Sequence, residues 1–175
     1  QSDHLAPYQP PNPAPPAAVS PEQRKQLDEL ISSRAAAFAQ AKPDLEAGAQ
    51  LFKTHCAACH QIGGEGGLLG PQLDGIGARG LERLCEDILD PGRNVDAHFQ
   101  MRLVTLKNGS TASGFLRAEA GQTLILADAA GKETRVPRAD IAKEDILPQS
   151  IMPPVFGQSI AEADFVHLLG WLLKQ

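Results

Sequence analysis

Apolar side chains at helical spacing predict four helices in this chain. They cover residues 21–41, 44–55, 81–90 and 159–175. The first begins with Ser20 as N-cap and Pro21 at the first helical position, and we expect it to lie outside the core. The third stops at Pro91–Gly92, and the last begins with a capping box of Ser159 and Glu162.

Residues 101–147 change to the alternating pattern that is typical of β-strands. Asn108–Gly109 separates two strand-like runs and is the strongest short hairpin signal in the chain. A second turn is predicted at Ala129–Gly131. We therefore predict a mainly α fold with an insert of three or four antiparallel strands between the third and last helices.

Proline marks the beginning of the chain, where seven of the 14 prolines fall within residues 7–21. Such a run favours the polyproline II conformation. It indicates either a linker that tethers the chain to an N-terminal anchor or domain, or a passive tail. We expect any export signal to have been removed or to lie outside this sequence. The predicted division is a tail over 1–20, a helix over 21–42 and one domain over 43–175 that carries the insert.

Composition and charge narrow the classes of function. The 175 residues suit one domain, and the net charge is −5, with 21 acidic and 16 basic residues. The chain has no basic run, which argues against nucleic acid as a partner. No apolar stretch is long enough to cross a bilayer.

The stretch "HCAACH" carries the candidate chemistry. Cys56, Cys59 and His60 fit the pattern C-x-x-C-H, which indicates covalent attachment of a c-type haem. Thiols three positions apart on one helical turn can each bond a vinyl group of the porphyrin, and His60 then faces the iron. Haem would also supply the flat apolar centre that six Phe, one Trp and one Tyr do not.

Three other interpretations of this motif stay open at this point. A structural zinc site needs four protein ligands, and only Cys85 with the distant His98 or His167 could complete one. A thioredoxin-like pair expects a βαβ pattern around it, but the preceding residues are helical. A chance match is the third. Cys85 itself is either a small buried core residue or a source of an intermolecular disulfide.

Residues 61–80 hold eight of the 16 glycines and follow the motif directly. Glycines let the main chain lie close against a ligand, although a flexible loop is the alternative. Apolar residues within the stretch favour a loop wrapped around something apolar; they are Ile62, Leu68, Leu69, Leu73 and Ile76.

A haem iron bound by His60 needs a sixth ligand or an open site. Met152 lies between Ile151 and two prolines in an irregular loop, which suits a thioether held at a fixed distance from the metal. Met101 is predicted to be a core residue in a strand, and His98 is a weaker candidate ligand. His167 is expected to face water on the last helix. Ligation by His60 and Met152 leaves no substrate position and indicates electron transfer.

These residues resemble class I c-type cytochromes over about residues 44–100 and 148–175. The resemblance implies that Gly48 and Phe52 belong to a helix that an aromatic of the last helix, Trp171, packs against. It also implies that the Pro71 carbonyl accepts a hydrogen bond from the free N–H of His60. Arg79 is a candidate partner for a haem propionate, with a solvated surface arginine as the alternative.

The order of the motifs is similar to that of a bacterial haem-binding domain that is often fused behind a β-propeller quinoprotein dehydrogenase. The shared motifs are "GPQLDGIG", "ILDP", "KNGSTASG", "RVPRADI" and "SIMPP". Nothing N-terminal in this sequence is long enough for the propeller, so we expect a stand-alone relative or one domain of a larger protein.

The expected function is that of a monohaem c-type cytochrome, not an enzyme, with one haem c attached through Cys56 and Cys59. It would pass single electrons from a periplasmic dehydrogenase or other oxidoreductase to an acceptor, in the periplasm or another extracytoplasmic place. Two alternatives remain: a ligand-binding, peroxidatic or sensor protein in which Met152 dissociates, and a binding module in which the β-insert recognises a partner.

Overall fold

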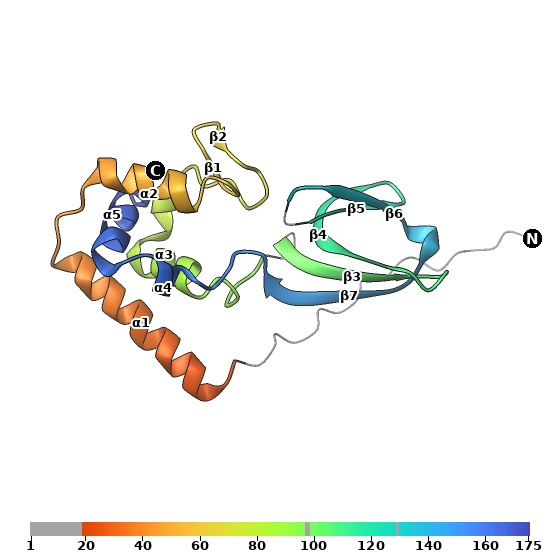
Figure 1. Cartoon of the computed structure of the whole chain (residues 1–175), viewed down its shortest axis with the longest axis horizontal. Coiled ribbons are helices and arrows are strands. Elements are labelled where there is room, and N and C mark those ends of the chain that lie inside the picture. Colours follow the sequence, from red (N-terminus) through yellow and green to blue (C-terminus); the bar gives the residue numbers. More distant parts are fainter. Residues whose placement is uncertain (1–18, 97–98, 129) are drawn as a thin grey trace, which may run out of the picture.

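The computed structural model describes residues 19–96, 99–128 and 130–175. Helices form one lobe and an antiparallel sheet forms a second lobe beside it (Figure 1). The predicted tail lies almost wholly outside the described residues. The candidate ligand His98 and Ala129, the first residue of the second predicted turn, lie outside them as well. None of the helices formed by the described residues is long and apolar enough to span a bilayer.

The helical lobe contains five α-helices in the described residues. They are α1 (Pro21–Ala39), α2 (Leu45–His55), α3 (Leu81–Leu89), α4 (Phe156–Ser159) and α5 (Glu162–Leu172). The predicted start of α1 is confirmed, because Ser20 and Gln23 form a capping box and Pro21 is the first helical residue. The predicted stop after α3 is confirmed as well, since Asp90 caps it just before Pro91.

The core of this lobe lies where α2 and α5 cross. Phe52 of α2 packs against Trp171 of α5 with ring centroids 4.8 Å apart. Helix α1 packs against the same core and does not stand outside it, contrary to expectation. Its Arg34 side chain lies over the Phe165 ring at 5.6 Å, and its apolar residue Leu30 contacts the buried cluster.

The start of α5 differs from the prediction. Ser159 ends the short helix α4, and Ala161 is the N-cap of α5 without a side-chain cap bond. The extended backbone of Ile160 separates the two helices, so Ser159 is not the N-cap of α5, and the predicted capping box with Glu162 was wrong.

The second lobe is a sheet of five antiparallel strands among the described residues. They are β3 (Gln100–Leu106), β4 (Thr111–Ala120), β5 (Thr123–Ala127), β6 (Glu133–Pro137) and β7 (Ile141–Ser150), in the order β6-β5-β4-β3-β7. The predicted hairpin turn is present between β3 and β4, with Gly109 at φ +85°. The fold class is therefore mixed, and the prediction of a mainly α fold was wrong.

Strand β7 is a fifth strand, beyond the three or four that were predicted. It pairs with β3 across the full length of β3 and forms one edge of the sheet. Its buried Glu144 forms an ion pair with Arg102 of β3. The register sets Gln100 opposite Ser150, so the two ends of the insert meet where the sheet joins the helical lobe.

Candidate cofactor site

Helix α2 delivers the C-x-x-C-H motif to the edge of the helical lobe. Its N-cap Asp44 accepts hydrogen bonds from the backbone N–H groups of Glu46 and Ala47 at 2.9 and 3.1 Å. The Asp44 N–H in turn donates to Nδ1 of His167 at 3.0 Å, so His167 does not simply face water as expected. This bond ties the start of α2 to α5.

The motif itself continues the chain by one more turn. The Cys56 N–H bonds to the Phe52 carbonyl at 2.8 Å, and the Cys56 carbonyl accepts from Cys59 and His60 at 3.0 and 2.9 Å. This local turn holds Cys56, Cys59 and His60 together at the end of α2. The two cysteines are free and half-buried.

His60 is oriented by the loop that follows it. Its Nδ1 lies 2.8 Å from the Pro71 carbonyl oxygen and donates to it, because a carbonyl can only accept. Burial lowers the pKa of His60, and the bond to Pro71 partly opposes that shift. The ring is therefore neutral near pH 7, and Nε2 is the nitrogen with a lone pair for a metal.

Glycines bring that loop into direct contact with the motif. A Cβ on Gly70 would lie 2.7 Å from Cε1 of the His60 ring, and one on Gly67 would lie 2.2 Å from the Ala58 carbonyl oxygen. The Gly70 N–H also bonds to the Cys59 carbonyl at 2.8 Å. The close approach predicted from the glycine content is therefore made to the motif and its histidine, and side chains at these positions would block it.

Burial also affects the Cys56 thiol. Burial and the neighbouring Cys59 raise the pKa of Cys56 to about 12. The free Cys56 thiol is therefore protonated near pH 7. In residues 19–96, 99–128 and 130–175, no group of three or more Cys, His, Asp or Glu is placed to hold a metal ion.

Met152 lies in the loop between β7 and α4, with its side chain partly buried against the helical core. Its N–H donates to the Ser150 hydroxyl at 3.1 Å, which fixes the start of this loop. Four residues on, the Phe156 ring meets the ring of His55 edge-on at a centroid distance of 6.5 Å. The Met152 loop thus leads into a contact beside Cys56, whereas Met101 is part of β3. Ligation by Met152 remains a prediction.

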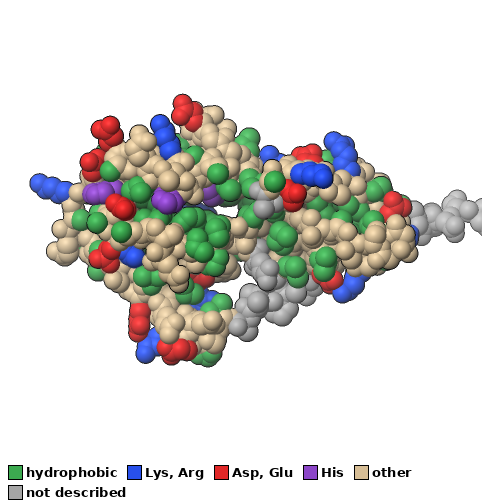
Figure 2. Space-filling view, viewed as in Figure 1, with side chains coloured by type: hydrophobic (Ala, Val, Ile, Leu, Met, Phe, Trp, Pro, Cys, Tyr) green, Lys and Arg blue, Asp and Glu red, His purple; other side chains and the backbone are tan. Residues whose placement is uncertain are grey.

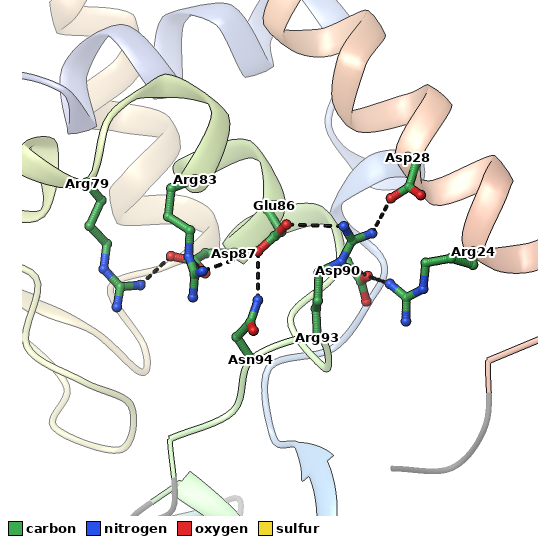
Figure 3. Close-up of polar contacts among 9 residues, drawn as sticks. All are labelled: Arg24, Asp28, Arg79, Arg83, Glu86, Asp87, Asp90, Arg93 and Asn94. Carbon is green, nitrogen blue, oxygen red and sulfur yellow. Dashed lines mark hydrogen bonds and ion pairs between the residues drawn. The ribbon is translucent and has the colours of Figure 1, made fainter.

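Arg79 ends a short 3-10 helix (Ile76–Arg79) and is half-exposed. It forms an ion pair with Asp87, which also accepts from Arg83 at 2.9 Å (Figure 3). The Arg79 guanidinium is thus held near the surface by the Asp87 carboxylate of α3. A role of Arg79 with a haem propionate remains a prediction.

A cavity of about 270 Å³ lies between the glycine loop and the sheet. Its lining residues are Leu68, Leu69, Gly70, Pro71, Gln72, Phe99, Phe115, Leu116 and Arg117. Figure 2 shows the surface hollowed between the two lobes, with histidine side chains on the helical side. Arg117 crosses from β4 and donates to the Leu68 carbonyl. Sequence reasoning missed Arg117, because its position depends on how the sheet packs.

Comparison with known proteins supports a cytochrome c domain. Residues 45–114 match the family model described as "Cytochrome c". A cytochrome c from Stellaria longipes is 54% identical over 37 residues, which is 21% of this chain and 34% of that protein. The alignment therefore spans about a third of that relative. The family match includes Cys56, Cys59, His60, Pro71 and Arg79, and ends before Met152.

Proposed function

We propose that this chain binds one haem c covalently through Cys56 and Cys59 and carries single electrons. The observation that supports this most is the bond from Nδ1 of His60 to the Pro71 carbonyl, directly after two half-buried cysteines on one turn. That bond selects the tautomer with a lone pair on Nε2, as a haem ligand requires. The match of residues 45–114 to cytochrome c supports the same conclusion.

Each residue would have a separate task. Cys56 and Cys59 would fasten the ring, and His60, through Nε2, and Met152 would bind the iron. When bound, the haem supplies an iron that exchanges one electron between its ferric and ferrous states. Pro71 keeps the His60 ring in place and increases its basicity, and Arg79 pairs with a propionate.

We propose an extracytoplasmic location and a redox protein as partner, with a dehydrogenase or another oxidoreductase as the electron donor. Thioether attachment of haem supports the location, since it normally takes place outside the bacterial cytoplasm. Binding of the iron by both His60 and Met152 would leave no position for a substrate, which favours a carrier over an enzyme.

The test is a set of reduced-minus-oxidised optical spectra of the wild type, Met152→Ala and Met101→Ala. We expect narrow low-spin bands and a weak near-infrared sulfur-to-iron band in the wild type. Met152→Ala loses the sulfur band, and the matched control Met101→Ala keeps it. Acid–acetone that removed the pigment from the wild type would contradict covalent attachment.

The same experiment separates the proposal from a haem protein with an open site. High-spin bands and rapid CO binding in the reduced wild type would indicate a labile Met152 and favour ligand binding over electron transfer. A sulfur band that persisted in Met152→Ala would show that the ligand was assigned to the wrong residue.

A further inference from the structure

Arg117 of β4 contacts the loop that orients His60. The pairing of β4 with β5 shifts register between Leu116 and Ala118, so Arg117 has no partner in β5. Such a bulge redirects a side chain away from the pattern of the strand. Here Arg117 is directed to the glycine loop, where its guanidinium donates to the Leu68 carbonyl.

Leu68 sits between two attachments of the loop to the haem motif. On one side the Gly67 N–H bonds to the Ala57 carbonyl, and on the other the Gly70 N–H bonds to the Cys59 carbonyl, both at 2.8 Å. Between them Leu68 is itself 48% exposed, so its side chain does little to hold the loop down. The bond from Arg117 is thus made at the exposed middle of the loop.

The next residues of this loop carry the contacts to the imidazole. Gly70 lies against the ring, and the Pro71 carbonyl accepts the Nδ1–H bond at 2.8 Å. Leu68 is three residues before Pro71, so a movement of the Leu68 carbonyl would also displace the Pro71 carbonyl. The cavity between this loop and the sheet gives residues 68–72 room to move away from His60.

We propose that Arg117 is a positioning residue through which the β-sheet fixes the His60–Pro71 hydrogen bond. The proposal deepens the proposed function and rests on His60 as the haem ligand. Arg117 acts through the Leu68 carbonyl, and the sheet thereby controls how firmly the ligand ring is held and how much electron density it gives to the iron.

The test is hydrogen exchange by NMR on the reduced, diamagnetic holoprotein. We compare the wild type, Arg117→Ala, Arg117→Lys and the control Arg135→Ala, which removes the same charge from the exposed side of the edge strand β6. In Arg117→Ala the Gly70 amide and the Nδ1–H of His60 exchange at least about tenfold faster, and the Nδ1–H resonance moves upfield. Arg117→Lys restores most of the protection, and Arg135→Ala matches the wild type.

Two outcomes would overturn the proposal. In one, Gly70 and His60 in Arg117→Ala exchange within twofold of the wild type. In the other, core amides of α5 such as Leu168 accelerate as much as Gly70, which would show general destabilisation. Failure of the proposed function is distinguishable, because a wild type without covalent haem still reports the Gly70 exchange rate.

Discussion

Gly48 of α2 and His167 of α5 are in direct backbone contact: a Cβ on Gly48 would lie 2.2 Å from the His167 carbonyl oxygen. The same Cβ would lie 2.6 Å from Cβ of Trp171. The crossing of the two helices thus requires glycine at this position. Because α2 carries the haem motif, the contact also sets where that motif lies relative to α5.

Gly48→Ala should therefore destabilise the protein by about 2–3 kcal/mol, since the backbone of α5 would have to move away. At an exposed helical site the same change would stabilise the protein by roughly 0.5–1 kcal/mol. The sign of the change in the free energy of unfolding therefore distinguishes a tight crossing from an open site. Urea unfolding measures it, with Gln50→Ala on the exposed face of α2 as a control that stays within about 0.5 kcal/mol. A Gly48→Ala protein as stable as the wild type would contradict the tight crossing.

Cys85 should make stability depend on alkaline pH. Its side chain is fully buried, which confirms the prediction of a core residue, and burial with Glu82 nearby raises its pKa from 9.0 to about 11. Between these values the unfolded chain releases the thiol proton and the folded chain keeps it. The free energy of unfolding therefore falls as pH rises from 9 to 11, by about 2 kcal/mol.

The measurement is denaturant unfolding at several pH values for the wild type and Cys85→Ala. Other groups titrate in this range in both proteins, so the difference between the two slopes isolates Cys85. Parallel pH profiles would show that the thiol is not held protonated in the folded state.

Local signals predicted those parts of the fold that depend on neighbouring residues. Ser20 and Pro21 set the start of α1, and Asn108–Gly109 makes the first hairpin of the sheet. The proline–histidine bond came only from resemblance to a family. Its residues are eleven positions apart, and no local pattern joins them.

The missed features depend on contacts between distant residues. Strand β7 contains Lys143, Glu144 and Asp145, which disfavour a strand by propensity. Pairing with β3 and the buried contact of Glu144 with Arg102 override that preference. The bulge at Arg117 likewise exists only once β4 and β5 are paired.

The packing of α1 on α3 should depend on Asp90. The Asp90 carboxylate is 8% exposed and pairs with Arg24 of α1 and with Arg93, which also reaches Asp28 of α1 (Figure 3). Asp90→Asn leaves the two guanidiniums without their buried anion and should cost about 2–3 kcal/mol.

The matched control is a solvent-exposed ion pair within α1. Lys25 and Glu29 are 3.8 Å apart and 69% and 66% exposed, so Glu29→Gln should cost less than about 0.5 kcal/mol. Thermal unfolding of the two variants measures the difference. Equal losses would show that Asp90 contributes no more than a surface pair.

The last prediction concerns the sheet as a separable unit. Gln100 and Ser150 face each other across the ladder, and the buried clusters of the two lobes share no residue. A variant in which two glycines replace residues 101–149 should therefore keep the crossing of α2 and α5. We expect it to retain covalent haem, the low-spin spectrum and cooperative unfolding of the helices.

The Gly70 amide of this variant should exchange faster than in the wild type, because Arg117 and its bond to Leu68 are gone. A full-length Leu126→Asp variant, which places a charge in the core of the sheet, is the companion measurement, since it disrupts the sheet without shortening the chain. If neither protein accumulated with haem, the two lobes would have to fold as one cooperative unit. Haem retained in both would establish residues 19–100 and 150–175 as the part of the chain that suffices to hold the cofactor.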